Sequence, residues 1–407
     1  MISRRKFITT IIVVIMLTAF LTFTISNLLL IETGDKVIIS KAKYNELKNI
    51  SIKYGKHEYL LDFVEKNFLF ELDEDKMIEG SLSGMIDALD DPYTEYMTKE
   101  DFDSFMEHTE GSYEGIGVYI APSEDNYILV IAPIEDTPAE KAGIKTGDKI
   151  IKINGKDFTA DQMDEAVSIM KGTPGTDVTI TILREKKDGK VETYDLIITR
   201  ETIRIKTVKS AVIQDNIGYI RITTFDQQTY KDFKNDLKEL EKQNIRGLVL
   251  DLRYNPGGLV DVTADIVDEL IGKSIVTYTQ TKDGEREYYK SDKNKIDVPL
   301  VVLVNEGSAS ASEILSGAIK DTGSGVLVGT KTFGKGIVQR ILPINDGTGI
   351  KITVSEYFTP NGINIHGIGI EPDVIIEMPE DAMYGYEYYD QDIQLQKAVE
   401  IIEKNIE

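Results

Sequence analysis

The chain has 407 residues, enough for two or three domains, and its 41% hydrophobic and 28% charged residues are ordinary for a globular protein. The formal net charge of -23 argues against a nucleic-acid partner, because the chain offers no basic stripe to meet phosphates. Cysteine is absent, which excludes a thiol nucleophile, a thiolate metal site and disulfides. Only three histidines occur, His57, His108 and His366.

A long uncharged stretch of 25 residues runs from residue 7 to residue 31, directly after Arg4, Arg5 and Lys6. As a helix rising about 1.5 Å per residue, it exceeds the roughly 30 Å hydrocarbon core of a membrane. The positive charges before it favour a cytoplasmic N-terminus and export of the remainder. We therefore expect a single-pass membrane anchor. The alternative is a cleaved signal peptide and a secreted protein, although the stretch is long for one and shows no Ala-x-Ala site.

Residues 36–110 are predicted to be mostly helical, because apolar side chains recur there with helical spacing. The recurring residues are Tyr59, Leu60, Phe63, Val64, Phe68, Met77, Ile78, Leu82, Met85, Ile86 and Leu89. The stretch 84–97, GMIDALDDPYTEYM, by itself predicts only a helical packing or dimerisation element. Apolar residues within 395–402 predict another amphipathic helix, which makes a packing or dimer contact.

Two motifs mark a small domain in residues 111–200. The first, YEGIGVYI at 113–120, alone indicates no more than a glycine-containing hairpin. The second, DTPAEKAGIKTGDKIIKING at 136–155, is more specific, because it joins a helix start, a glycine turn into a strand and an Asn-Gly hairpin turn. A further helix is expected from residue 159 or 160 to Lys171, with one face formed by Met163, Val167 and Met170.

Residues 201–377 alternate between strand and helix patterns, which predicts an α/β layered domain. Strands are expected at 217–222, 247–252 and 300–304, and helices at 229–243, 260–271 and 312–320. The sequence RYNPGG at 253–258 follows the second strand and alone indicates only a turn.

The stretch NEGSASASE at 305–313 precedes a predicted helix and supplies a candidate nucleophile. A serine at a helix start can hold an attacked carbonyl oxygen near free backbone N–H groups. The alternative is that Ser308, Ser310 and Ser312 only cap the helix. Glu313, in the first turn, suits the helix dipole.

Lys335 stands between Gly334 and Gly336, before a predicted strand at 337–342. Period two places Lys335 on one side with Gln339, where it is partly desolvated; a solvated loop lysine is the alternative. Residues 329–335 fit the first seven positions of a P-loop. The eighth position, which is Ser or Thr in a P-loop, is Gly336 here, and this argues against a nucleotide site.

A serine nucleophile in this chain needs a base other than a neighbouring histidine. The sequence holds no Gly-x-Ser-x-Gly elbow, and His57 lacks the second histidine of His-Glu-x-x-His. A lysine that can be held neutral is the leading candidate, and distant His366 is the alternative.

In this order, from about residue 40 to the end, the motifs resemble the carboxyl-terminal processing proteases, also called tail-specific proteases. Together with the N-terminal transmembrane helix expected above, the resemblance implies a multidomain α+β protein with a helical segment, a PDZ domain, an α/β layered protease domain and a C-terminal helix. The PDZ domain is a small barrel-like sheet with two helices. The implied boundaries are 1–35, 36–110, 111–200, 201–377 and 378–407.

The resemblance also assigns roles. Ser310 matches the nucleophile, Lys335 the general base and Gln339 the carboxamide that orients the lysine. The oxyanion hole would combine the N–H of Ala311 with that of Gly257 or Gly258. The PDZ residues implied to bind a peptide are Ile116, Gly117, Val118, Met163 and Val167.

The implied activity is that of a membrane-anchored, exported serine endopeptidase that cleaves proteins at or near their C-termini. Its PDZ domain would recognise the substrate tail, no metal or cofactor is required, and a homodimer is expected. To be mostly neutral near pH 7, Lys335 needs a pKa roughly three below its usual value of about 10.4, with burial as the cause. The alternative is a PDZ scaffold with an inactive protease domain.

Overall fold

The computed structural model describes residues 3–28, 31–33, 36–186, 188–379 and 381–406. The chain forms two compact units, which divide between Gly80 and Ser81. The first unit contains α1 (Arg4–Leu28), β1 (Ile31–Thr33), β2 (Lys36–Ile38), α2 (Lys41–Asn67) and the start of α3 (Glu74–Asp87). Within α1, Arg4–Thr24 is long and apolar enough to cross a membrane, judged by length and composition. The same test is passed by a signal sequence, so both N-terminal expectations stand.

The second unit begins with the end of α3, β3 (Glu95–Met97) and α4 (Lys99–Glu110). Gly111 ends α4 in the left-handed conformation, with φ of 70°. Beyond it, β4 (Ser112–Gly115) pairs antiparallel with β11 (Glu201–Arg204), so the chain enters and leaves the PDZ region side by side.

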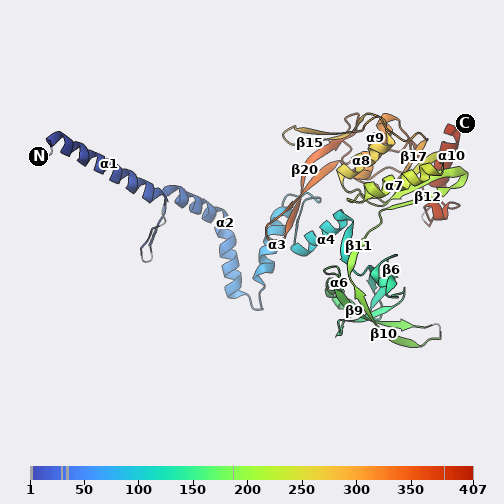
Figure 1. Ribbon diagram of the computed structural model, residues 1–407, viewed down its shortest axis with the longest axis horizontal. Coiled ribbons are helices and arrows are strands. Elements are labelled where there is room, and N and C mark those ends of the chain that lie inside the picture. Colours follow the sequence, from blue (N-terminus) through green and yellow to red (C-terminus); the bar gives the residue numbers. More distant parts are fainter. Residues whose placement is uncertain (1–2, 29–30, 34–35, 187, 380, 407) are drawn as a thin grey trace. The chain divides into compact units, whose positions relative to one another are not determined.

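The PDZ region folds around its own apolar core, and its elements gather in one cluster (Figure 1). The sheet order is β10-β9-β7-β6-β5, with β8 paired to β7. The strands are β5 (Val118–Pro122), β6 (Ile128–Pro133), β7 (Lys149–Ile153), β8 (Lys156–Asp157), β9 (Asp177–Glu185) and β10 (Val191–Thr199). The helices are α5 (Pro138–Lys141), the 3₁₀ turn η1 (Ala160–Gln162) and α6 (Met163–Met170). The second helix is therefore shorter than expected, because its first turn is 3₁₀.

The region expected to be the protease, residues 201–377, is built on a six-stranded sheet in the order β12-β13-β14-β17-β18-β21. All neighbours are parallel except the β12–β13 pair. The strands are β12 (Val208–Ile213), β13 (Ile217–Ile222), β14 (Gly247–Asp251), β17 (Leu300–Val304), β18 (Val326–Gly329) and β21 (Val374–Ile375). Two further 3₁₀ turns are η2 (Gln214–Asn216) and η3 (Tyr386–Tyr388).

Helices cover both faces of this sheet (Figure 1). One face packs against α7 (Thr229–Lys242), α8 (Val260–Leu270) and α9 (Ala311–Thr322). The other face packs against α10 (Ile393–Ile406), whose apolar residues are buried in the sheet. Of the two roles expected for this C-terminal helix, packing is therefore the one that the structure shows.

A second sheet, in the order β16-β15-β20-β19, lies beside the first and carries the site. Its strands are β15 (Ile275–Thr281), β16 (Arg286–Lys290), β19 (Ile337–Pro343) and β20 (Gly349–Phe358). The short strand β3 also pairs with β20 and so brings residues 95–97 to this sheet.

Candidate active site

Ser310 stands directly before α9 in a strained backbone conformation. Its φ of 52° and ψ of -112° are rare for a residue with a side chain and cost of order 1–3 kcal/mol. Neighbouring bonds hold it there: Asn255 O accepts from Ala309 N–H at 3.0 Å, and the Tyr357 hydroxyl donates to Ser310 O at 3.1 Å. Strain of this kind, held by surrounding bonds, is typical of functional positions.

The Glu313 carboxylate ties the Ser310 segment to the Lys335 segment. Its Oε2 accepts from the N–H of Ser310 at 2.9 Å and from the N–H of Lys335 at 2.8 Å. Its Oε1 accepts from the Thr332 hydroxyl at 2.6 Å and from Gly334 N–H at 2.7 Å. Glu313 is fully buried, so its role goes well beyond the helix-dipole effect expected from the sequence.

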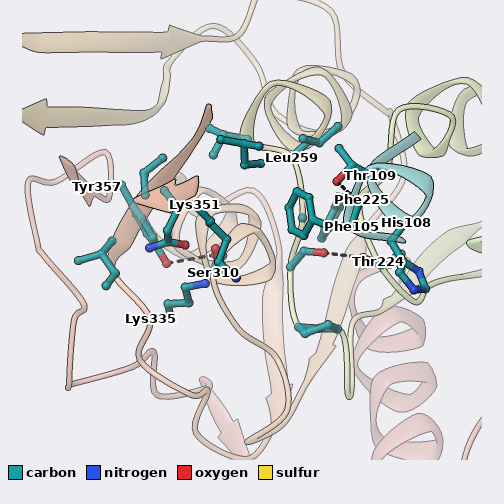
Figure 2. A pocket seen from close by; sticks show the side chains of 18 residues that line it. Phe105, His108, Thr109, Thr224, Phe225, Leu259, Ser310, Lys335, Lys351 and Tyr357 are labelled. Carbon is teal, nitrogen blue, oxygen red and sulfur yellow. Dashed lines mark hydrogen bonds between the residues drawn. The ribbon is translucent and has the colours of Figure 1, made fainter. Parts of the chain in front are cut away.

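Ser310 and Lys335 line one cavity of about 340 Å³. Figure 2 shows Ser310, Lys335, Lys351 and Tyr357 gathered on one side of it. The other side is largely apolar and includes Phe105 from α4. A peptide could therefore enter a partly apolar hollow and meet both a hydroxyl and an amine.

The pKa of Lys335 lies below its ordinary value, chiefly because the side chain is buried and then because the Lys351 ammonium is near. Three carboxylates, Asp91, Glu313 and Glu95, oppose this lowering. The amine also lies 4.6 Å from the centre of the Tyr93 ring. Lys335 is thus not a freely solvated loop lysine.

Gln339 lines the same cavity, but its side-chain amide donates to Thr353 Oγ1 at 3.2 Å. Its strand, β19, pairs with β20 so that Gln339 and Thr353 are directly opposite. The side-chain nitrogen of Gln339 is therefore already hydrogen-bonded to β20, and its carbonyl oxygen is the atom that could accept a hydrogen bond from a lysine.

The glycine loop at 257–258 lies against the start of α9. A Cβ on Gly257 would stand 2.9 Å from both Ala311 N and Ser310 Cβ. Gly257 N–H already donates to Asn255 Oδ1 at 2.9 Å. Within the described part of the chain, neither Gly258 N–H nor Ala311 N–H has an acceptor.

The PDZ region contains a second hollow, of about 190 Å³. It is lined by Tyr113, Gly115, Ile116, Gly117, Val118, Ile120, Val167, Met170 and Lys171. Four of the five expected peptide-binding residues are here. Met163 is not among these residues, because it is the first residue of α6 and lies one turn before Val167. Met170 and Lys171, at the other end of the helix, line the hollow instead.

Among the described residues, no hydrogen bond joins a histidine side chain to Ser310. His366 is exposed in a loop and contacts the Tyr93 ring edge-on at 6.5 Å. His108 lines the cavity from α4, on the side away from Ser310 (Figure 2). His57 is exposed on α2, in the other compact unit.

Sequence reasoning missed Tyr93, Lys351 and Tyr357 as neighbours of the site. They reach it through the pairing of β3 with β20 and through β20 itself. No motif in the sequence predicts that β3 pairs with β20. The alternation of residues along 349–358 is the one available signal, and it does not say which strand lies alongside.

Comparison with known families first defines a peptidase that carries a PDZ domain. Peptidase family S41 matches residues 216–376, and the PDZ domain family matches residues 129–184. The family described as the activating protease CtpB N-terminal domain matches residues 15–101.

Individual relatives narrow the class. The carboxy-terminal processing protease CtpA of Bacillus subtilis (strain 168) is 38% identical over 364 residues, which cover 89% of this chain and 76% of that protein. CtpB of the same organism is 37% identical over 330 residues, covering 80% and 68%. The carboxy-terminal-processing protease of Bartonella bacilliformis is 38% identical over 324 residues, covering 77% and 73%. This chain belongs to the carboxy-terminal processing proteases of peptidase family S41.

Proposed function

We propose that this protease cleaves peptide bonds at or near substrate C-termini through an acyl-enzyme on Ser310, with Lys335 as general base. One observation carries the proposal: Ser310 and Lys335 line the same cavity, and the Glu313 carboxylate accepts from the backbone N–H of both. Burial, which lowers the pKa of Lys335, favours the neutral amine that a base requires.

In the proposed reaction, neutral Lys335 takes the proton of the Ser310 hydroxyl as Oγ attacks the scissile carbonyl carbon. The resulting ammonium protonates the leaving amine, and the acyl-enzyme forms. Water, deprotonated by the same lysine, then hydrolyses the ester. Gln339 would orient Lys335 through its carbonyl oxygen.

The oxyanion of the tetrahedral intermediate would accept from backbone N–H groups of Ala311 and Gly258. Gly258 is preferred over Gly257, because Gly257 N–H is already committed to Asn255 Oδ1. Each such donor is worth roughly 3–4 kcal/mol of transition-state stabilisation in other serine proteases.

The remaining assignments concern binding and placement. The hollow lined by Ile116, Gly117 and Val118 would take the terminal carboxylate of a substrate tail added beside β5. Helix α1 would anchor the protein in the membrane, with the domains at 36–110, 111–200, 201–377 and 378–407 outside the cytoplasm. A second copy would cover apolar side chains that α2 exposes, including Leu47, Leu60 and Phe63.

A fluorophosphonate probe tests the nucleophile and also separates the protease from an inactive scaffold. The probe should label wild-type protein at Ser310, as mapped by peptide mass spectrometry, and should leave Ser310→Ala unlabelled and unable to cleave a peptide. Ser308→Ala is the matched control and should stay labelled. An unlabelled, inactive wild type would favour the scaffold.

A further inference from the structure

A second lysine shares the cavity with Ser310 and Lys335. Lys351, on β20, lines it with a side chain only 22% exposed, and Figure 2 shows it on the same side of the cavity as Ser310 and Lys335. Along the strand it precedes Thr353 by two residues, and Thr353 is the partner of Gln339. Residues two apart on a strand face the same way, so Lys351 belongs to the face that carries the site.

The position of this ammonium is set by the segment around β3. Lys351 and Glu95 stand directly opposite each other in the β3–β20 pairing, and Lys351 Nζ lies 2.7 Å from Glu95 Oε1. The ring of Phe105 supports it from α4, 5.6 Å from Nζ. Tyr93, two residues before Glu95, places its ring 4.6 Å from Lys335 Nζ, so residues 93–95 contact both amines.

Two ammonium groups in one small hollow disfavour each other, since like charges at close range raise the free energy of the doubly charged state. The charges that face Lys335 come from three elements. Lys351 on β20 disfavours its charged form, whereas Glu313 on α9 and the two carboxylates Asp91 and Glu95 favour it. Burial also disfavours the charged form and is the largest influence. Glu95 therefore acts twice, because it attracts Lys335 and partly neutralises Lys351.

We propose that Lys351 is a positioning residue for proton transfer: its ammonium, held by Glu95 in the cavity that Ser310 and Lys335 line, disfavours a second positive charge on the Lys335 amine. The inference rests on the proposed Ser-Lys mechanism and extends it by naming the residue that adjusts the base. It assigns Glu95 the opposite influence.

The test is the pH dependence of kcat/KM for a short peptide in Lys351→Met, Lys351→Arg and Glu95→Gln. Lys351→Met should move the acid limb to higher pH by at least about half a unit, which is about a threefold rate loss on that limb, and reach the wild-type plateau at high pH. Lys351→Arg keeps the charge and should restore the wild-type limb. Glu95→Gln should move the limb to lower pH. Lys351→Met and Glu95→Gln both remove the Lys351–Glu95 ion pair, so a purely structural role would move the acid limb in the same direction in both. Opposite shifts therefore identify an effect of charge.

Lys320→Met is the matched control. Lys320 lies on α9 outside the cavity, and its ammonium pairs with Asp373 at 3.3 Å. A parallel NMR titration of the Lys335 side chain in the Ser310→Ala background, assigned with Lys335→Met, needs no activity. It should show the same two opposite shifts in Lys351→Met and Glu95→Gln, and no shift in Lys351→Arg. An unmoved titration in Lys351→Met, or movement in the same direction in Glu95→Gln, overturns the inference. If Lys335→Arg cleaves as well as wild type, the Ser-Lys mechanism fails instead, and the NMR result still decides whether Lys351 acts on Lys335.

Discussion

At the scale of single residues, three serines near α9 differ in what their hydroxyls do. Ser308 and Ser312 are fully buried, and their hydroxyls donate to Leu252 O at 2.8 Å and to Asn255 O at 2.9 Å. Ser310 is half-buried and lines the cavity. Ser308 and Ser312 therefore hold the loop in place, and the strained Ser310 is the one of the three that lines the cavity.

Glu313 offers the first prediction. Glu313→Gln replaces one acceptor oxygen with an NH₂ group, which then faces N–H donors of the loop. The free energy of unfolding should fall by about 1–3 kcal/mol in a urea titration, and kcat should fall at all pH values even where the protein is folded. Glu306 is an exposed carboxylate whose one hydrogen bond to a described residue comes from the Thr330 hydroxyl, so Glu306→Gln should change stability by less than about 0.5 kcal/mol. Equal effects of the two substitutions would contradict the bridging role.

The sequence predicts some of these residues better than others. Ser310 and Lys335 stand in short motifs, and the family they indicate is confirmed by the comparisons. Glu313 looks like an ordinary first-turn acid, because its partners at 332–335 are near only after folding. Lys351 carries no motif at all.

At the scale of elements, the predicted helices and strands of the protease region agree with the structure to within two residues at each end. Strong periodicity explains this for α7 and α8, which each bury an apolar stripe, whereas α9 is buried on all sides from Ala311 to Ile319. The β3–β20 pairing was not predicted, because a three-residue strand inside a helical region has no periodic pattern. For the C-terminal helix, the sequence predicted either packing within the chain or a dimer contact, and α10 packs on the sheet.

The start of α10 is fastened to the sheet by a buried ion-pair cluster. Arg253, fully buried after β14, pairs with Asp251 at 2.6 Å and with Asp392 at 2.7 Å. Burial alone would raise the pKa of Asp251, but the Arg253 guanidinium outweighs it and holds that pKa below its usual range. A carboxylate with a depressed pKa stabilises the fold above its unfolded pKa of about 3.9, and this contribution is lost as pH falls through the folded value.

Asp392→Ala should therefore lower the free energy of unfolding by about 3–5 kcal/mol, because it leaves Arg253 with one counter-ion in the interior. Asp390→Ala removes an exposed carboxylate from the same segment and should change it by less than about 0.5 kcal/mol. Urea unfolding followed by circular dichroism measures both. A small effect of Asp392→Ala would show that water reaches the cluster.

The PDZ hollow predicts recognition of a free C-terminus. In the full chain carrying Ser310→Ala, which should bind without cleaving, a peptide with an apolar C-terminal residue should bind more tightly than its C-terminal amide. The reason is that the amide lacks the charge for charge-assisted hydrogen bonds to the loop. Fluorescence anisotropy gives both Kd values, and equal values would rule out terminus recognition.

At the scale of the whole molecule, α1 is either retained as a membrane anchor or removed as a signal peptide. A retained α1 predicts that an N-terminal and a C-terminal epitope tag both stay in the membrane pellet after alkaline extraction. The physical reason is that the uncharged stretch at 7–31 buries enough apolar surface to hold the chain in the bilayer. A soluble product with only the C-terminal tag would instead show a cleaved signal peptide.

The most direct measurement of the central claim is peptide cleavage by Lys335→Arg across a range of pH. Neutral lysine accepts the serine proton only above its pKa, so wild-type kcat/KM should rise with pH through an ionisation of Lys335, displaced below the usual value by burial. Arginine stays charged, so Lys335→Arg should lose at least about a hundredfold in rate at every pH while remaining folded. The triple substitution of His57, His108 and His366 should retain the rise with pH. An active Lys335→Arg together with an inactive but folded His366→Ala would show that the base is histidine.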